Sequence, residues 1–504
     1  MLALAATVTV TAESDLVMFG GDASRNFVSS EKNLPTKWNL KTGENIKWVA
    51  ELGSQTYAGP ILYDGKIFVG TNNEALKDEN MPGDRGNIMA FDAASGDLLW
   101  QSAHAKLGAG RVNDWPLQGI CSTPAAENGI VYYVSNRAEV IAADVNGFHD
   151  GENNGPFKKE GEFRMVTEKG EDGESKQVRK FIEKQGKLDE DILWKYDLIG
   201  ELDVFPHNLA AGSPLIVGDL IFVITGQGVD EGHFNVPTPL APSFVVLNKK
   251  TGELVWENAD PADAVLHGSW SNPSYGVIGG KPQVLFPGGD GWLYSFEPKT
   301  GKLIWKFDMN PKDSKWELGG RGTRNNVISM AVIHDGIAYI AVGQDPEHGE
   351  GPGNLWAIDG AGKSGDITET GVVWHVGGED FHRTMSSAAI HDGVMYIADL
   401  NGFVYALDVK TGKRLWMYDT FAAIWGSTFY ADGKVYIGDE DGDIAVLKAG
   451  REGKEGEGIL LHETNMGTAV YTTPIAKDGV IYVASRTRLF AIEEGASWKP
   501  KAGK

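Results

Sequence analysis

The segment Leu407-Asp408-Val409-Lys410-Thr411-Gly412-Lys413-Arg414-Leu415-Trp416 decides the fold of this protein. An apolar run, a tight turn containing Gly and a second run ending in Trp predict a β-hairpin, because turns need Gly and strands favour aromatic residues. The same pattern recurs at 91–100, 247–256 and 296–305. One hairpin cannot bury its apolar face alone, so the copies must stack against one another.

A second repeated pattern, a turn with Gly followed by an apolar strand, lies upstream of the hairpins. Its eight copies are 64–69, 128–133, 218–223, 280–285, 335–340, 392–397, 432–437 and 478–483. Another short strand precedes each copy, often after Ser or Thr and Pro, as at 122–124. Four strands joined in this order form one blade of a β-propeller. We therefore predict an all-β fold: an eight-bladed β-propeller of four-stranded antiparallel blades over residues 15–495, followed by a tail at 496–504.

The two ends of the repeat predict how the ring closes. Trp48 ends a strand of the outer type that has no preceding partner, and the last blade stops near Ile492 without a Trp-bearing outer strand. We expect the N-terminal segment to supply that strand, because closure removes exposed sheet edges. The seventh blade is degenerate, since Leu460-Leu461 stands where the other copies carry Trp.

The composition, the net charge and the N-terminal segment narrow the classes of function open to this protein. The formal net charge of −23 argues against nucleic acid, because phosphate binding needs clustered Lys and Arg. Cys121 is the only cysteine, so an intrachain disulfide is impossible, and no stretch approaches the length of a membrane span. Residues 1–14 carry an apolar run and then small residues, which predicts the remnant of an export signal and a periplasmic or otherwise exported protein; an ordinary apolar N-terminus is the alternative.

The turn pattern also predicts which face carries a site. Within each blade, the turns between the first and second strands and between the third and fourth strands are mostly tight, and they lie on one face of the ring. The long and varied loops lie on the opposite face, and such loops usually carry function. The ligand-binding candidates on that face are Asp114, Trp115, His207, Asn208, His267, Trp270, Arg321, Arg324, His382, Arg383, Trp425 and Tyr471. The aromatic members are either a stacking platform for a flat ligand or sugar, or anchors of their loops. The arginines either receive an anionic group or pair with loop acids.

Metal binding is a further possibility on this face. Imidazole and carboxylate groups suit transition ions, so His207, His267, His348 or His382 could contribute to a centre, although they lie on different blades and lack a metal-motif spacing. The loop with Asp345, Glu347, His348 and Glu350 could hold Ca²⁺, although it lacks the EF-hand spacing. The alternative is that these groups bond to neighbouring loops and line a solvated funnel.

One insertion interrupts the face with tight turns. Residues 148–190 expand the third-to-fourth turn of the second blade into a charged, Gly-containing stretch. Residues 176–184 predict a short amphipathic helix within it. The insertion is either a solvated excursion or an element that docks a partner.

The recurring pattern Ala-x-Asp-x-x-Thr-Gly-x-x-x-Trp resembles the repeat of the pyrroloquinoline quinone (PQQ) propellers over essentially the whole chain. Residues 343–351 and 424–428 resemble a bacterial PQQ-like subgroup common in planctomycetes. The resemblance implies that the Trp of one blade docks against the Gly turn of a neighbouring blade. That superfamily includes quinoprotein alcohol dehydrogenases and a noncatalytic lipoprotein of the outer-membrane β-barrel assembly machinery.

Two functions follow from this resemblance. We favour an exported scaffold of the cell envelope that holds a protein partner or a small ligand in its funnel. For this function the sequence identifies no cofactor. The alternative is a PQQ- and Ca²⁺-dependent quinoprotein alcohol or sugar dehydrogenase. The catalytic branch typically carries a vicinal disulfide that a lone Cys121 cannot form, so the repeat by itself does not imply a bound quinone.

Overall fold

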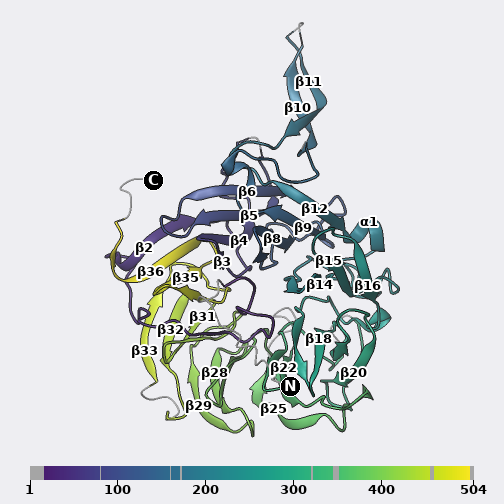
Figure 1. The fold of residues 1–504 in the computed structure, drawn as a ribbon, viewed down its shortest axis with the longest axis vertical. Coiled ribbons are helices and arrows are strands. Elements are labelled where there is room, and N and C mark those ends of the chain that lie inside the picture. Colours follow the sequence, from purple (N-terminus) through teal and green to yellow (C-terminus); the bar gives the residue numbers. More distant parts are fainter. Residues whose placement is uncertain are drawn as a thin grey trace, which may run out of the picture.

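In the computed structural model, four-stranded antiparallel sheets follow one another around a ring of eight blades, which confirms the predicted fold (Figure 1). The structure describes residues 16–79, 81–158, 160–170, 173–318, 322–343, 351–453 and 459–499. Within this part, no helix has the length and apolar character needed to cross a bilayer.

The first four blades run from Ile61 to Asp308. Their strands are β3 (Ile61–Tyr63), β4 (Lys66–Asn72), β5 (Arg85–Asp92) and β6 (Leu98–Ala105); β7 (Ala125–Glu127), β8 (Ile130–Val134), β9 (Glu139–Asp144) and β12 (Ile192–Asp197); β13 (Leu215–Val217), β14 (Leu220–Ile224), β15 (Phe244–Asn248) and β16 (Leu254–Asn258); and β17 (Ser274–Ile278), β18 (Lys281–Pro287), β19 (Trp292–Phe296) and β20 (Leu303–Asp308). Three short helices connect strands in this half: η1 (Gly147–Asp150), α1 (Leu198–Leu202) and η2 (Ala262–Ala264).

The last four blades complete the ring. Their strands are β21 (Val332–His334), β22 (Ile337–Val342), β23 (Pro352–Ile358) and β25 (Val372–His382); β26 (Ala389–His391), β27 (Val394–Ala398), β28 (Phe403–Asp408) and β29 (Arg414–Asp419); β30 (Phe429–Ala431), β31 (Lys434–Gly438), β32 (Asp443–Lys448) and β33 (Leu460–Asn465); and β34 (Ile475–Lys477), β35 (Val480–Ala484), β36 (Arg488–Ser497) and β2 (Glu44–Glu51). Two short strands add parallel pairs, β1 (Val28–Ser29) to β30 and β24 (Gly365–Asp366) to β20.

The core lies between the blades. Strands such as β27 and β35 are buried along their whole length, because neighbouring blades cover both of their faces. This placement explains why they read as continuous apolar runs instead of alternating ones.

Tryptophan side chains join each blade to the next. Six of them donate from Nε1 to a backbone carbonyl in the third-to-fourth turn of the following blade at 2.9–3.0 Å; they are Trp48, Trp100, Trp194, Trp256, Trp374 and Trp416. Gly412 shows why the turn requires Gly: its φ is +70°, and a Cβ there would lie 2.7 Å from the Trp374 ring. This contact confirms the Trp-on-Gly docking that the resemblance implies.

Two junctions depart from the pattern. Trp305 lies against Gly360 of the next blade but donates to Gln283 Oε1 of its own blade at 2.8 Å. At the seventh blade, which lacks the Trp, the buried cluster contains Leu34 and Trp38 from the N-terminal segment. Trp38 therefore supplies the aromatic bulk that β33 does not.

The N-terminal segment closes the ring as predicted. β2 pairs antiparallel with β36 as the outer strand of the eighth blade, with Trp48 opposite Ala491. Residues 16–29 also cross the middle of the ring, visible as the purple trace in Figure 1, and accept hydrogen bonds from the innermost strands. The donors are the backbone N–H groups of Ala126, Tyr275, Ile333 and Tyr430, and the acceptors are the carbonyls of Val17, Ala23, Ser24 and Phe27.

Arg25 anchors this crossing segment. Its side chain is fully buried and donates to the carbonyls of Pro273 at 2.8 Å, Phe19 at 2.6 Å and Pro214 at 3.2 Å. Burial lowers the pKa of Arg25 to about 9, so the guanidinium remains charged at neutral pH. The fork of N–H donors thus joins segments from three parts of the chain.

The insertion differs from the prediction. It lies between β9 and β12, but residues 176–184 fall in a strand, β11 (Ser175–Glu183), and the predicted helix is wrong. β11 pairs in register with β10 (Gly161–Lys169), with Phe163 opposite Phe181, and the two form a ribbon that leaves the ring (Figure 1). Periodicity within nine residues could not reveal that a partner strand of equal length precedes them.

Candidate functional site

A cavity of about 320 Å³ lies on the axis, on the face with the long loops. Each blade contributes residues that immediately precede its innermost strand. One lining residue from each blade in turn is Tyr57, Cys121, Asn208, Trp270, Met330, Met385, Trp425 and Tyr471. Phe19 of the crossing segment also lines the cavity, so the N-terminal segment forms part of its wall.

Aromatic rings form one side of this axial cavity. Tyr57 and Tyr471 are stacked with ring centroids 5.0 Å apart and an interplanar angle of 10°. Trp425 lies 4.7 Å from Tyr471. Trp115 and Trp270 line the cavity from the second and fourth blades. These aromatic candidates therefore converge on one space.

The cavity carries little formal charge. None of its described lining residues is Asp, Glu, Lys or Arg. Burial raises the pKa of the Cys121 thiol to about 12, so this group is neutral. Burial also raises the pKa of Tyr57 and of Tyr471 above the usual tyrosine value. An uncharged ring system suits such a lining better than a charged organic ligand does.

Three histidines from three loops meet beside the cavity. His207 precedes β13, His233 follows β14, and His267 precedes β17; their candidate ligand atoms all lie within 4.8 Å of one another. His207 and His267 are each 1% exposed, and His267 lines the cavity. The sequence placed His233 outside the candidate set, because residues on separate loops give no spacing signal.

Hydrogen bonds to backbone carbonyls hold the three loops together. The Val229 N–H donates to the His267 carbonyl at 2.9 Å, and Trp270 Nε1 donates to the His207 carbonyl at 3.1 Å. Gly228 lies between them, where a Cβ would come within 2.6 Å of the His207 Cβ. These contacts fix the positions of the loops that carry the His cluster.

Other predicted residues support loops instead of lining the cavity. Asp114 is buried and accepts from Lys106, from the Leu107 N–H at 3.0 Å and from Asn136 at 2.7 Å. Burial raises its pKa, against the opposing effect of these donors.

Three basic candidates likewise have structural partners. Arg324 makes a two-pronged ion pair with Asp308, at 2.6 and 3.0 Å. His382 Nδ1 lies 2.9 Å from Asp399 Oδ2. The Arg383 N–H donates to the Gly351 carbonyl at 2.8 Å. Arg321 and the candidate metal-binding residues Asp345, Glu347, His348 and Glu350 lie outside the described residues.

A second cavity, of about 460 Å³, lies at the base of the insertion, where the first two blades meet it. Glu162 at the start of β10 pairs there with Arg85 at 2.8 Å. Burial alone would raise the pKa of Glu162, but hydrogen bonding from Arg85 and the charge of Lys184 hold it below its usual value. These ion pairs fix the ribbon to the ring.

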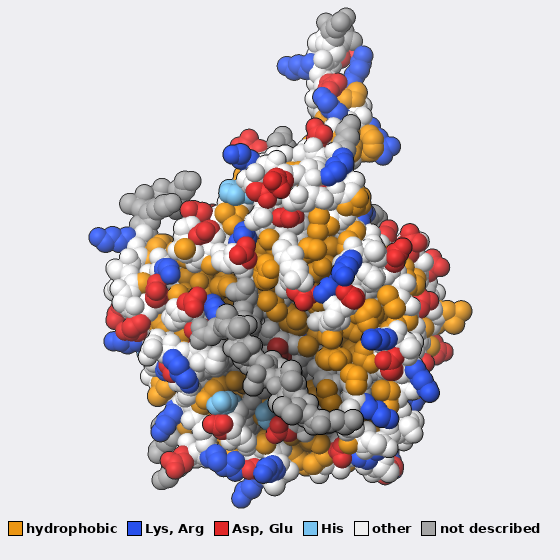
Figure 2. Space-filling model, viewed as in Figure 1, with side chains coloured by type: hydrophobic (Ala, Val, Ile, Leu, Met, Phe, Trp, Pro, Cys, Tyr) orange, Lys and Arg blue, Asp and Glu red, His pale blue; other side chains and the backbone are white. Residues whose placement is uncertain are grey.

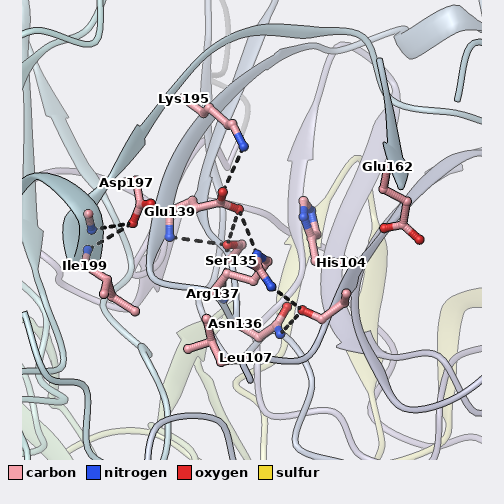
Figure 3. A network of polar contacts seen from close by, with 12 residues as sticks. His104, Leu107, Ser135, Asn136, Arg137, Glu139, Glu162, Lys195, Asp197 and Ile199 are labelled. Carbon is pink, nitrogen blue, oxygen red and sulfur yellow. Dashed lines mark hydrogen bonds and ion pairs between the residues drawn. The ribbon is translucent and has the colours of Figure 1, made fainter. Parts of the chain in front are cut away.

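A polar chain runs beside this outer cavity: Tyr133 and Glu190 are buried, and Glu190 and His104 line the cavity. Tyr133 donates to Glu190 Oε1 at 2.6 Å, and His104 Nε2 lies 2.9 Å from the Tyr133 hydroxyl. Burial raises the pKa of Glu190 to about 7 and holds the pKa of His104 well below its usual value. In Figure 3 the carboxylate of the neighbouring Glu139 accepts from Lys195 and from the Ser135 hydroxyl, and the Glu139 N–H donates to Ser135 Oγ. The sequence did not single out this chain, because His104, Tyr133 and Glu190 come from two strands and a loop.

The space-filling view places these features on the surface. In Figure 2, hydrophobic side chains gather over the middle of the ring, whereas Lys, Arg, Asp and Glu side chains are interspersed around its rim and along the ribbon.

Eight four-stranded blades, joined by Trp-on-Gly contacts around a central cavity, define a PQQ-like repeat β-propeller. The chain belongs to the family described as outer membrane protein assembly factor BamB, whose model matches residues 9–112, 186–329 and 289–493.

Individual relatives match shorter segments. The chain is 33% identical to 1-butanol dehydrogenase (cytochrome c) of Thauera butanivorans over 97 residues, or 17% of this chain and 14% of that enzyme. It is 36% identical to outer membrane protein assembly factor BamB of Shewanella oneidensis over 84 residues, or 15% of this chain and 20% of that protein. The matched segments thus span a fifth or less of these relatives.

A solved structure shows the same fold. The crystal structure of BamB from Moraxella catarrhalis superposes with a TM-score of 0.53 and 14% identity, covering 89% of this chain and 99% of that one. At this identity the likeness shows the architecture alone.

Proposed function

We infer that the protein is an exported propeller of the cell envelope that acts as a ligand- or partner-binding scaffold. The observation that carries this proposal is the axial cavity with its stacked Tyr57–Tyr471 pair and adjacent Trp425, free of formal charge among its described lining residues. Its ligand would be a neutral planar ring, either of a small molecule or of a partner's side chain. Kinship with an outer-membrane assembly factor and the apolar run at residues 2–6 support the envelope setting.

The quinoprotein alternative fits this cavity less well. Ca²⁺ requires several oxygen ligands with carboxylates among them, and a tricarboxylate quinone requires cationic partners. The described lining offers neither kind of group. Because the chain is similar to an alcohol dehydrogenase over 97 residues, the experiment below also tests the dehydrogenase function.

The test is a calorimetric titration with two probes. For 2-naphthol, a neutral planar ring of 11 heavy atoms, roughly 0.5 kcal/mol per atom gives a Kd on the order of 100 μM. Because an aromatic contact contributes about 0.5–1.5 kcal/mol, Trp425→Ala should weaken binding about 2- to 12-fold. Trp316→Ala, at an exposed Trp, is the matched control and should bind as the wild type does.

PQQ with and without Ca²⁺ is the second probe. We expect no Ca²⁺-dependent binding of PQQ. Tight Ca²⁺-dependent binding with turnover of an alcohol would overturn the proposal in favour of the dehydrogenase, and failure of 2-naphthol to bind would overturn the assignment of the ligand.

A further inference from the structure

We propose that His207, His233 and His267 form a transition-metal site in the wall of the axial cavity. The three side chains are brought together by loops that are far apart in the sequence, and their candidate ligand atoms lie within 4.8 Å of one another. Their ring centroids are 4.5, 4.6 and 4.8 Å apart.

The spacing of the nitrogens matches what a metal requires. His207 Nε2 and His233 Nε2 are 3.1 Å apart. Two nitrogens bound to one tetrahedral Zn²⁺ at about 2.0–2.1 Å are separated by about 3.3 Å. The His207–His233 pair therefore needs almost no movement, and the candidate ligand atom of His267 lies within 4.8 Å of those of the other two.

A second contact orients His207 for this role. His207 Nδ1 lies 2.7 Å from the Val229 carbonyl, which can only accept a hydrogen bond. Nδ1 must therefore carry the proton, and Nε2 carries the lone pair that a metal requires. A backbone carbonyl bonded to the distal nitrogen is the usual partner of a metal-binding histidine.

The residues around the cluster favour a metal site over three histidines that are only packed against one another. Gly228 allows the backbone to approach His207 closely, as the Cβ clash above shows. His233 adopts φ +58°, a left-handed conformation that is costly for a residue with a side chain and that concentrates at functional sites. His207 and His267 are buried, whereas His233 is partly exposed and leaves a route from solvent.

The donor set defines the class of ion. Three imidazole nitrogens suit Zn²⁺, Cu²⁺, Ni²⁺ or Co²⁺ and do not suit Ca²⁺ or Mg²⁺, which take oxygen ligands. Three protein ligands leave a fourth position for water or a bound molecule. Because His267 also lines the axial cavity, an ion held here would lie beside a ligand in that cavity.

The test is a Zn²⁺ titration of the untagged protein after chelation with EDTA and removal of the chelator. We expect one Zn²⁺ per chain by calorimetry, and a Co²⁺ derivative with the visible absorption of a nitrogen-coordinated ion. His233→Asn keeps a residue that tolerates positive φ and should weaken Zn²⁺ binding on the order of 100-fold. His149→Asn, at an exposed histidine outside the cluster, should bind as the wild type does.

A folding readout separates loss of the ligand from loss of structure. Zn²⁺ should raise the unfolding midpoint of the wild type and leave that of His233→Asn unchanged, while the two proteins unfold alike without metal. Absence of stoichiometric Zn²⁺ binding, or equal affinity in His233→Asn and His149→Asn, would overturn the proposal. The 2-naphthol titration is run in EDTA, so it tests the ligand of the cavity independently of the metal.

Discussion

Replacing Glu190 with Gln should remove a pH-dependent destabilisation of this protein. Glu190 is 4% exposed, and its Oε1 accepts from the Tyr133 hydroxyl at 2.6 Å. Within the described part of the chain, Oε2 is buried without a hydrogen-bond partner. Burial raises the pKa of Glu190 from 4.5 to about 7, so the folded protein must either keep this carboxyl protonated or bury its charge.

The magnitude follows from this shift. At 1.36 kcal/mol for each pKa unit, raising the pKa from 4.5 to about 7 corresponds to about 3 kcal/mol. Between these two values the folded state holds a proton that the unfolded state has lost. Stability is therefore fully retained below pH ~4.5 and falls as the pH rises towards ~7, by about 3 kcal/mol in all. Gln is neutral at every pH and keeps an oxygen that can accept from the Tyr133 hydroxyl. The Glu190→Gln variant should therefore not lose this stability as the pH rises.

The measurement is urea unfolding, followed by Trp fluorescence, of the wild type and of Glu190→Gln at pH 5, 6, 7 and 8. The stability of the variant relative to the wild type should increase with pH and level off above pH ~7. His104 is present in both proteins, so its own titration cancels in the difference. Glu201→Gln, at an exposed glutamate, should show a pH-independent difference. If Glu190→Gln behaves like Glu201→Gln, the reasoning about the buried carboxyl is refuted.

Two further substitutions test how the ring is held together. Gly412→Ala and Gly433→Ala both force Ala into φ +70°, but only at Gly412 does the Cβ meet Trp374, whereas Gly433 has nothing within 4 Å. Thermal unfolding should show Gly412→Ala less stable than Gly433→Ala by about 1–3 kcal/mol, and equal midpoints would contradict the Trp-on-Gly contact. Arg25→Lys should lower stability by about 2–4 kcal/mol in urea unfolding, because Lys cannot reproduce the fork that reaches three carbonyls. An unchanged midpoint would show that the crossing segment does not depend on this guanidinium.

Much of the fold could be predicted because its signals are local and repeated. The repeated pattern is a turn with Gly and a Trp three or four residues later. Both can be recognised within a segment of ten residues, as at 407–416. Even ring closure by Trp48 was predictable, because an unpaired outer strand at one end matched a missing one at the other. The same local reasoning failed at 176–184, where cross-strand pairing with β10 outweighed a helical pattern.

The candidate site was predictable only in part, because no local sequence pattern shows which loop side chains point towards the axis of the ring. Trp115, Asn208, His267, Trp270, Trp425 and Tyr471 line the axial cavity as loop residues on the expected face. Asp114 and Arg324 lie on loops and His382 ends strand β25, and all three make contacts that hold these segments in place instead of lining the cavity. Tyr57 was missed, since nothing local distinguishes it from any other loop tyrosine.

The sequence by itself determined the architecture: a Trp at the end of one hairpin and a Gly in the turn of the next require each other, and repetition of that pair builds the ring. Only the tertiary structure decided which side chains share a space. His207, His233 and His267 become neighbours because three loops are bonded to one another above the ring. Glu190 becomes a titrating group near neutral pH because the base of the insertion buries it. Burial and proximity depend on contacts between distant segments, and no local pattern encodes them.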